Sequence, residues 1–105
     1  MEISFSIIIP LYNKAPYIER AINSVLNQSL QNFEIIVVND GSSDGGEKIV
    51  TKIVDERLKL VSQKNAGVSA ARNKGALEAK SEYLAFLDGD DTWEPNFLSE
   101  LVKLI

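Results

Sequence analysis

The feature that most restricts the fold of this chain is a regular alternation of short apolar runs with segments of helical period. The first run, Ile3–Pro10, contains three consecutive isoleucines and is apolar on both faces, as expected for a strand covered on both sides of a sheet. Similar runs occupy Phe33–Asn39, Leu58–Ser62 and Tyr83–Leu87. Strands that alternate with helices predict βα units around a mainly parallel sheet.

A helix is predicted after each of these strands. Between Pro16 and Asn27, apolar residues recur at intervals of three and four, which places them on one helical face. Shorter stripes predict helices around Ile49–Val54, over Val68–Ala79 and over Pro95–Leu104. Because crossovers between parallel strands are right-handed, we expect a Rossmann-like α/β fold with a four-stranded sheet, the first strand near its middle, and flanking helices. A chain of 105 residues is expected to form one core, so residues 1–105 are assigned to a single domain.

The charge and the residue types exclude several classes of function. The net charge of −4 and the pI near 4.8 argue against nucleic-acid binding, which needs a clustered basic surface. The sequence contains neither cysteine nor histidine, which rules out disulfides, zinc–thiolate sites and imidazole catalysis. Any metal must therefore be held by oxygen atoms, which favours magnesium, manganese or calcium.

No segment of the sequence reads as a membrane span or a secretory leader. The apolar run Ile3–Leu11 is too short to cross a bilayer, and no basic segment leads an apolar stretch with a small-residue cleavage site. We expect the chain to stay in the cytoplasm, and a longer protein containing it to act there or at the cytoplasmic face of the membrane.

Polar clusters follow all four predicted strands. They are Tyr12–Lys14, Asp40–Asp44, Lys64–Asn65 together with Arg72, and Asp88–Asp91. Parallel strands end at a common edge of the sheet, and open α/β folds bind their ligands at that edge. The sequence thus predicts one binding site built from these four loops.

The acidic loop Asp88–Asp91 is the most informative of these clusters. Three carboxylates close together repel one another unless a cation lies between them, and a divalent cation would also bind the oxygens of a diphosphate. Asp88, Asp90 and Asp91 are therefore predicted to cluster around a metal ion. The alternative is a loop of helix-capping acids ahead of Pro95.

Two further residues have both a binding and a purely structural interpretation. Asp40 ends the second strand, where its carboxylate could accept a hydrogen bond from a base such as uracil, or could simply form a turn. Asp44, three residues before Glu47, resembles a helix capping box. Arg72 lies near the start of the third predicted helix, where its guanidinium could bind phosphate beside a helix N-terminus, or could be a solvated surface group.

Four sequence blocks, taken in order, resemble the beginning of a family-2 glycosyltransferase. They are Ser6–Asn13, Val37–Asp44, Asn65–Gly75 and Phe86–Asp91, and together they extend over nearly the whole chain. The resemblance implies the nucleotide-diphospho-sugar transferase fold and inverting transfer of a sugar from a nucleotide donor, most simply a UDP-sugar. The acceptor would be a saccharide or glycolipid hydroxyl in polysaccharide or glycoconjugate synthesis.

The resemblance also assigns roles to individual residues. Nucleotide contacts are expected from Pro10, Tyr12, Asn13, Asp40, Arg72 and Asp88, with Asp40 on the uracil ring. Asp90 is expected to hold the Mn²⁺ or Mg²⁺ ion that bridges the diphosphate. The general base of such enzymes lies well beyond this motif, so no catalytic residue is expected among these 105, and the chain is expected to be an N-terminal fragment of a catalytic domain that does not transfer sugar by itself.

Two other functions are compatible with the same residues. Asp88 to Thr92 also fits the Asp-x-Asp-x-Thr motif of haloacid-dehalogenase-like phosphatases, although that motif normally ends the first strand of its domain. A non-catalytic nucleotide-binding module would keep the fold without activity. Dinucleotide and P-loop sites lose support because their glycine-rich motifs are absent. Finally, the resemblance implies further strands beyond Tyr83–Leu87, so this strand is expected to form an open sheet edge that leads to self-association or marginal stability.

Overall fold

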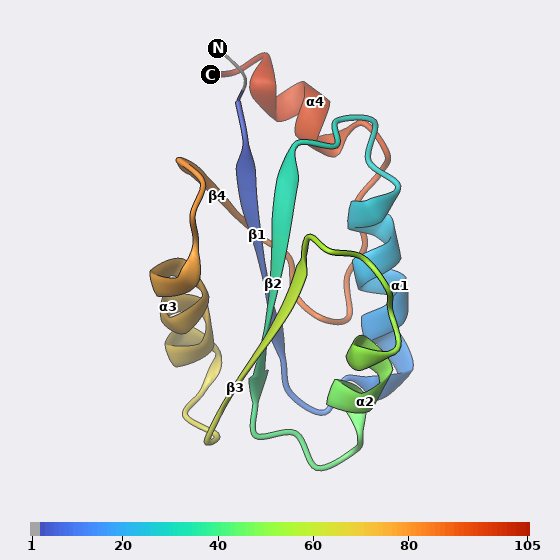
Figure 1. Cartoon of the computed structure of the whole chain (residues 1–105), viewed down its shortest axis with the longest axis vertical. Coiled ribbons are helices and arrows are strands. Elements are labelled where there is room, and N and C mark those ends of the chain that lie inside the picture. Colours follow the sequence, from blue (N-terminus) through green and yellow to red (C-terminus); the bar gives the residue numbers. More distant parts are fainter. Residues whose placement is uncertain (1–2) are drawn as a thin grey trace.

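The computed structural model describes residues 3–105, which fold into alternating strands and helices (Figure 1). The elements are β1 (Phe5–Leu11), α1 (Ala15–Leu26), β2 (Phe33–Asp40), α2 (Gly46–Thr51), β3 (Leu58–Gln63), α3 (Val68–Glu78), β4 (Tyr83–Phe86) and α4 (Phe97–Val102). Every predicted strand and helix is present, with boundaries shifted by a few residues. The α/β fold predicted from the apolar alternation is confirmed.

The four strands form one parallel sheet in the order β3-β2-β1-β4. β1 pairs with β2 from Phe5↔Phe33 to Leu11↔Asn39, and with β4 from Phe5↔Tyr83 to Ile8↔Phe86. β1 therefore lies inside the sheet, as predicted, while β4 is an edge. All residues of β1 are buried, which explains why its sequence is apolar without alternation.

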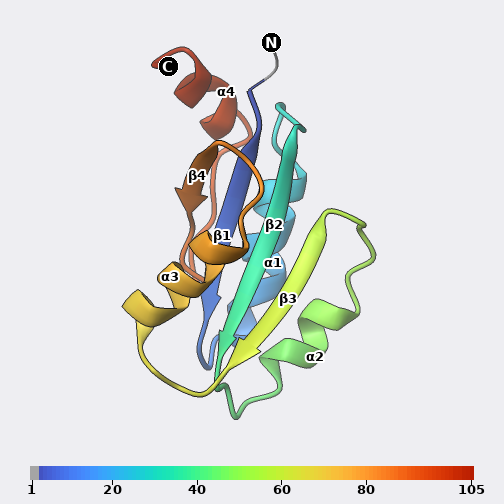
Figure 2. The ribbon, with the colours of Figure 1, turned by 60° about the vertical axis from the view of Figure 1, so that its left-hand side comes forward.

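Helices cover both faces of the sheet (Figures 1 and 2). α1 and α2 lie on one face, where Ile7 and Ile9 join the main core with residues of α1. α3 lies on the other face and packs on β1 and β2. Its Gly75 sits directly over Ile8, because a Cβ atom at Gly75 would be only 2.4 Å from Ile8 Cγ2. The missing side chain lets α3 approach the sheet closely.

The last helix is shorter than predicted. We expected it over Pro95–Leu104, but α4 begins at Phe97. The reason is tertiary: the side-chain amide of Gln28 donates to the carbonyl of Glu94, and the Ser29 N–H donates to the carbonyl of Pro95. These bonds hold the chain against the end of α1, and a turn closed by the Phe97 N–H and the Glu94 carbonyl precedes α4. After β4 the chain thus returns to the amino ends of the strands, far from the edge where the polar loops lie (Figure 1).

Between residues 3 and 105, no helix has the length and apolar character needed to cross a membrane.

Candidate nucleotide site

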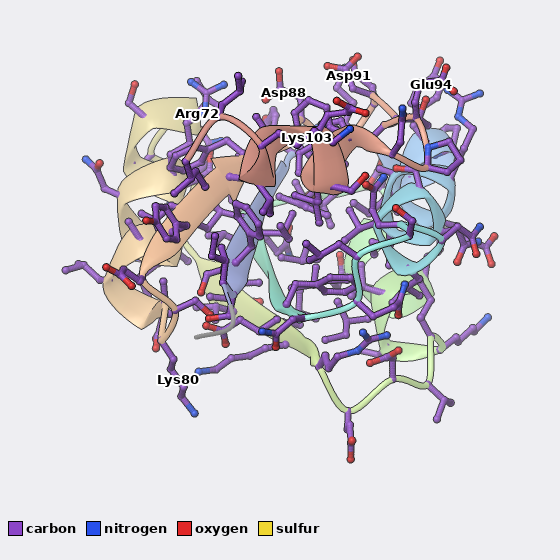
Figure 3. The ribbon with its side chains drawn as sticks, turned by 90° about the horizontal axis from the view of Figure 1, so that it is seen from above. Arg72, Lys80, Asp88, Asp91, Glu94 and Lys103 are labelled. Carbon is purple, nitrogen blue, oxygen red and sulfur yellow. The ribbon has the colours of Figure 1, made fainter. Side chains whose placement is uncertain are left out.

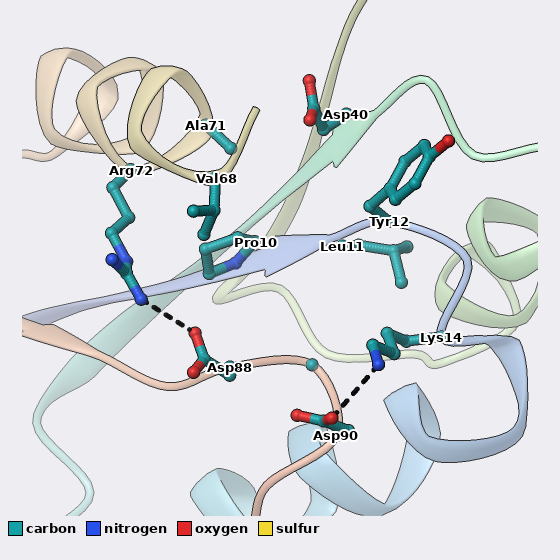
Figure 4. Close-up of a pocket in the computed structure, with 11 residues that line it drawn as sticks. Pro10, Leu11, Tyr12, Lys14, Asp40, Val68, Ala71, Arg72, Asp88 and Asp90 are labelled. Carbon is teal, nitrogen blue, oxygen red and sulfur yellow. Dashed lines mark hydrogen bonds and ion pairs between the residues drawn. The ribbon is translucent and has the colours of Figure 1, made fainter. Parts of the chain in front are cut away.

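A pocket of about 370 Å³ opens where the predicted loops meet, at the carboxyl ends of the strands (Figure 4). β1 and the loop after it, β2, α3 and the loop after β4 all contribute to its walls. The lining residues are Pro10, Leu11, Tyr12, Lys14, Asp40, Val68, Ala71, Arg72, Asp88, Gly89 and Asp90. The prediction of one site built by convergent loops therefore matches the geometry of the described residues.

One part of the pocket wall is apolar. Pro10 and Tyr12 come from the end of β1, and Val68 and Ala71 come from the first turns of α3 on the other side. The side chains of Tyr12 and Val68 are 48% and 50% exposed, which is high for such large apolar groups. Their open surfaces can pack against the faces of a planar ring, because burying exposed apolar area is favourable.

The other part of the pocket contains two ion pairs (Figure 4). Arg72 Nη2 lies 3.1 Å from Asp88 Oδ1, and Lys14 Nζ lies 3.2 Å from Asp90 Oδ2. Each pair joins the loop after β4 to a different element, α3 in the first case and the start of α1 in the second. All four side chains are between 41% and 48% exposed, so both pairs are accessible to a ligand.

Gly89 brings this acidic loop close to β1. A Cβ atom at Gly89 would lie 3.1 Å from the carbonyl oxygen of Pro10 and 3.5 Å from Lys14 Cβ. A side chain at this position would require the loop or the Pro10 backbone to shift by a few tenths of an ångström. The glycine therefore sets how near the two flanking carboxylates stand to the apolar wall of the pocket.

The prediction that Asp88, Asp90 and Asp91 form one cluster is wrong. Among residues 3–105, no three acidic side chains are grouped so that they could hold a metal ion. The Asp91 N–H donates to the carbonyl of Asp88, and this turn places Asp91 in an adjoining hollow with Thr92 and Trp93. Arg72 pairs with Asp88, and Lys14 pairs with Asp90.

The remaining donor set still suits Mg²⁺ or Mn²⁺. Mg²⁺ is commonly held by one or two carboxylates together with substrate phosphates, not by a cage of protein ligands. Asp90, with Asp88 across Gly89, supplies such a partial set, and every available ligand atom is an oxygen. The residues therefore fit an ion that binds together with a diphosphate.

Asp40 lines the pocket, but its carboxylate is already fully hydrogen-bonded. Oδ1 accepts from Gln63 Nε2 and from the Ala66 N–H, and Oδ2 accepts from Asn65 Nδ2 and from the Gly67 N–H, at 2.8 to 3.2 Å. Burial raises the pKa of the Asp40 carboxyl, but the hydrogen bonds outweigh it, so the pKa lies below its ordinary value.

These bonds change the interpretation of two sequence features. A carboxylate offers about four acceptor positions, so uracil could bond Asp40 only by displacing a protein donor. In addition, the charge of Asp40 already lies beside the start of α3, where a bound phosphate was one of the two interpretations offered for Arg72. The structure thus gives Asp40 the role of anchoring the β3–α3 loop.

Asn13 does not line the pocket. Its Oδ1 accepts a 2.8 Å hydrogen bond from the Ser43 N–H, and its own N–H donates to Ser42 Oγ. It therefore joins the loops after β1 and β2. The predicted capping box at Asp44 is also different: its two oxygens accept from the N–H groups of Ala15 and Gly46, so Asp44 bonds the starts of both α1 and α2.

Lys14 belongs to one of the four predicted polar clusters, Tyr12–Lys14, but the sequence assigned it no individual role. It follows Tyr12 by two residues in the loop directly after β1, which is a signal that could have marked it. Its role depends on its distance from Asp90, and that distance exists only in the folded chain.

Comparison with known proteins identifies relatives of the whole chain. The model of the family described as glycosyl transferase family 2 matches residues 6–105. Glycosyltransferase GlyA of Streptococcus pneumoniae is 38% identical over 102 residues, which are 95% of this chain and 15% of GlyA. The chain spans 15% to 41% of the length of the curated relatives it matches.

Solved structures agree in fold. Residues 1–349 of S. aureus TarS, in complex with UDP-GlcNAc, superpose with a TM-score of 0.91 at 32% identity, covering 98% of this chain and 31% of that one. The mannosyltransferase PcManGT of Pyrobaculum calidifontis, in complex with GDP-Man and Mn²⁺, gives a TM-score of 0.88 at 29% identity, with 94% of this chain and 31% of that one covered. The family match gives no support to the phosphatase alternative. With its parallel sheet, convergent loops and this match over residues 6–105, the chain belongs to glycosyltransferase family 2.

Proposed function

We propose that this chain binds the donor of a glycosyltransferase, a UDP-sugar together with Mn²⁺ or Mg²⁺. The observation that carries the proposal is the layout of the pocket, in which an apolar wall adjoins two accessible carboxylates that are each paired with a cation. A nucleoside diphosphate has the same division into a flat apolar base and a charged tail. The complexes of TarS with UDP-GlcNAc and of PcManGT with GDP-Man support a nucleotide-sugar ligand.

In this arrangement the base packs between Tyr12 and Val68, with Pro10 beneath it. Arg72 faces the diphosphate and the donor sugar from α3, together with Asp88. Arg72 has donor capacity to spare, since among the described residues its guanidinium makes one hydrogen bond, from Nη2 to Asp88. A free guanidinium donor suits a phosphate oxygen.

Asp90 is the protein ligand that we assign to the metal ion. Asp40, Asp88 and Asp90 outnumber Lys14 and Arg72 in the pocket lining, so a diphosphate adds negative charge to a site that is already negative. A bound divalent ion supplies the missing positive charge and stabilises the departing nucleoside diphosphate.

The rest of the reaction belongs to the same proposal. We infer inverting transfer to a saccharide or glycolipid hydroxyl, at the cytoplasmic side of the membrane, in polysaccharide or glycoconjugate synthesis. The support is the family membership alone. No residue of the pocket is assigned as the general base.

Titration calorimetry with UDP, GDP, CDP and dTDP, each with Mn²⁺ and with EDTA, tests the proposal. UDP should bind most tightly and more tightly with Mn²⁺. Asp90→Ala should remove the effect of Mn²⁺, while Asp91→Ala, which deletes the neighbouring carboxylate outside the pocket, should keep it. Absence of nucleotide binding, or equal loss of the Mn²⁺ effect in both variants, would overturn the assignment.

A further inference from the structure

Lys14 holds the carboxylate that the metal ion would need. Its Nζ is 3.2 Å from Asp90 Oδ2, and both residues line the pocket with side chains that are 41% exposed (Figure 4). An ammonium ion and a divalent cation cannot both occupy this position beside one carboxylate oxygen. Whichever oxygen of Asp90 the ion binds, its charge repels the ammonium beside it, so binding of the ion favours movement of Lys14 away from Asp90.

The energetic cost of breaking this pair is small. Exposed lysine–carboxylate pairs contribute little to stability, because water solvates both charges well and the long side chain loses entropy when it is held. A divalent ion that is also bound by a diphosphate has more charge and more ligands than an ammonium group. The pair is thus stable enough to neutralise Asp90 in the empty pocket and weak enough to open.

The backbone of Lys14 stays in place while its side chain moves. Its carbonyl accepts 2.9 Å hydrogen bonds from the N–H groups of Tyr17 and Ile18, which fixes the residue at the start of α1. Its Cβ lies beside Gly89, so the flexible four-carbon stem begins within the pocket wall. Lysine suits such a movement because its ammonium is a compact charge with three donors and no fixed plane.

We propose that Lys14 exchanges partners when the donor binds. In the empty pocket its ammonium neutralises Asp90; when the ion takes Asp90, the ammonium turns to the diphosphate. This inference rests on the proposed function. It makes Lys14 a competitor of the metal without nucleotide and a phosphate ligand with it, so that metal and nucleotide each bind better in the presence of the other.

Substitution of Lys14 by methionine, which keeps an unbranched stem and removes the charge, should have opposite effects on the two ligands. Mn²⁺ alone, followed by the electron paramagnetic resonance of the free ion, should bind about 2- to 5-fold more tightly, as expected for removal of a surface ion pair. UDP in the presence of saturating Mn²⁺ should bind about 3- to 10-fold more weakly, because the charge-assisted contact between the Lys14 ammonium and the diphosphate is lost. Uridine, which has no phosphate, should bind as before.

Two variants control for charge and for folding. Lys80→Met removes the same charge on the opposite side of the molecule from Arg72 and Asp88 (Figure 3), and should change none of the three affinities. Lys14→Arg keeps a cation and should retain both the competition with Mn²⁺ and most of the UDP affinity. Circular dichroism confirms that each variant is folded.

The results separate the exchange from the proposed function. The exchange is refuted if Lys14→Met leaves the affinity for Mn²⁺ unchanged or lowers it. It is also refuted if the substitution weakens the binding of uridine as much as the binding of UDP. Failure of the unaltered chain to bind UDP under any condition refutes the proposed function and with it the phosphate contact of Lys14. UDP binding that depends on Mn²⁺ but is indifferent to Lys14→Met refutes the exchange alone.

Discussion

Replacing Asp40 by asparagine distinguishes an anchor of the β3–α3 loop from a ligand of the base. The carboxylate is 3% exposed and accepts four hydrogen bonds, two on each oxygen. In the asparagine variant, Oδ1 can keep the bonds from Gln63 and Ala66. The amide nitrogen that replaces Oδ2 is a donor, and it would face the Gly67 N–H and Asn65 Nδ2.

The size of the effect follows from counting these groups. Asn65 Nδ2 keeps a second acceptor, the Asp40 carbonyl at 3.1 Å, so the Gly67 N–H is the donor left without a partner. An unsatisfied buried donor costs about 1 to 3 kcal/mol, and the two bonds that remain lose their charged acceptor. We expect Asp40→Asn to lower the free energy of unfolding by about 2 to 4 kcal/mol at pH 7, a large part of the stability of a small domain.

The effect should depend on pH in a defined direction. The pKa of Asp40 is lowered in the folded chain, so its contribution is fully present above the pKa of the unfolded state, about 3.9, and is lost as the pH falls toward the folded value. The stability difference between the unaltered chain and the variant should therefore be constant above about pH 5 and should shrink below about pH 4. Urea denaturation followed by circular dichroism measures it at each pH.

A matched control is Asp88→Asn, which changes a carboxylate of the same pocket that is 48% exposed. Its free energy of unfolding should change by no more than about 0.5 kcal/mol. If Asp40→Asn is equally harmless to stability but weakens UDP binding selectively, then Asp40 contacts the base directly and the anchoring role is incorrect.

Two further predictions concern the scaffold. Gly75→Ala should lower the free energy of unfolding by about 1 to 3 kcal/mol in urea denaturation, because the new methyl group would overlap Ile8 beneath α3, and an unchanged value would show that α3 can shift outward. The open edge at β4, where Phe86 is 45% exposed, should cause self-association that sedimentation equilibrium detects and that Phe86→Lys reduces; a monomer at all concentrations would contradict this expectation.

Most of the fold could be predicted from local patterns. The apolar run around Ile7–Ile9 requires cover on both faces, and the spacing of apolar residues in α1 identifies a helix with one buried side. The start of α4 could not be predicted in this way. Gln28, on a distant part of the chain, bonds the Glu94 carbonyl and the Leu98 N–H, and a turn at residues 95–96 precedes the helix.

The sequence predicted which loops meet at the site, but it did not predict the individual contacts between their side chains. Parallel strands that end together must bring the loops after them to one edge, which is why Tyr12, Arg72 and Asp88 were placed correctly in one pocket. The same reasoning could not show that Asn13 turns to Ser43, or that Asp91 turns out of the pocket.

The sequence by itself determined the βα order, the parallel sheet and the edge at which polar groups gather. The reason is that the spacing of apolar and polar residues within a strand or helix can be read from neighbouring positions in the sequence. Only the tertiary structure decided which charged side chains form ion pairs and hydrogen bonds with each other. Lys14 pairs with Asp90, Arg72 pairs with Asp88, and the loop after β3 surrounds Asp40. Electrostatic and hydrogen-bond energies fall off steeply with distance, so these partners exist only after packing has brought separate loops to within about 3 Å of each other.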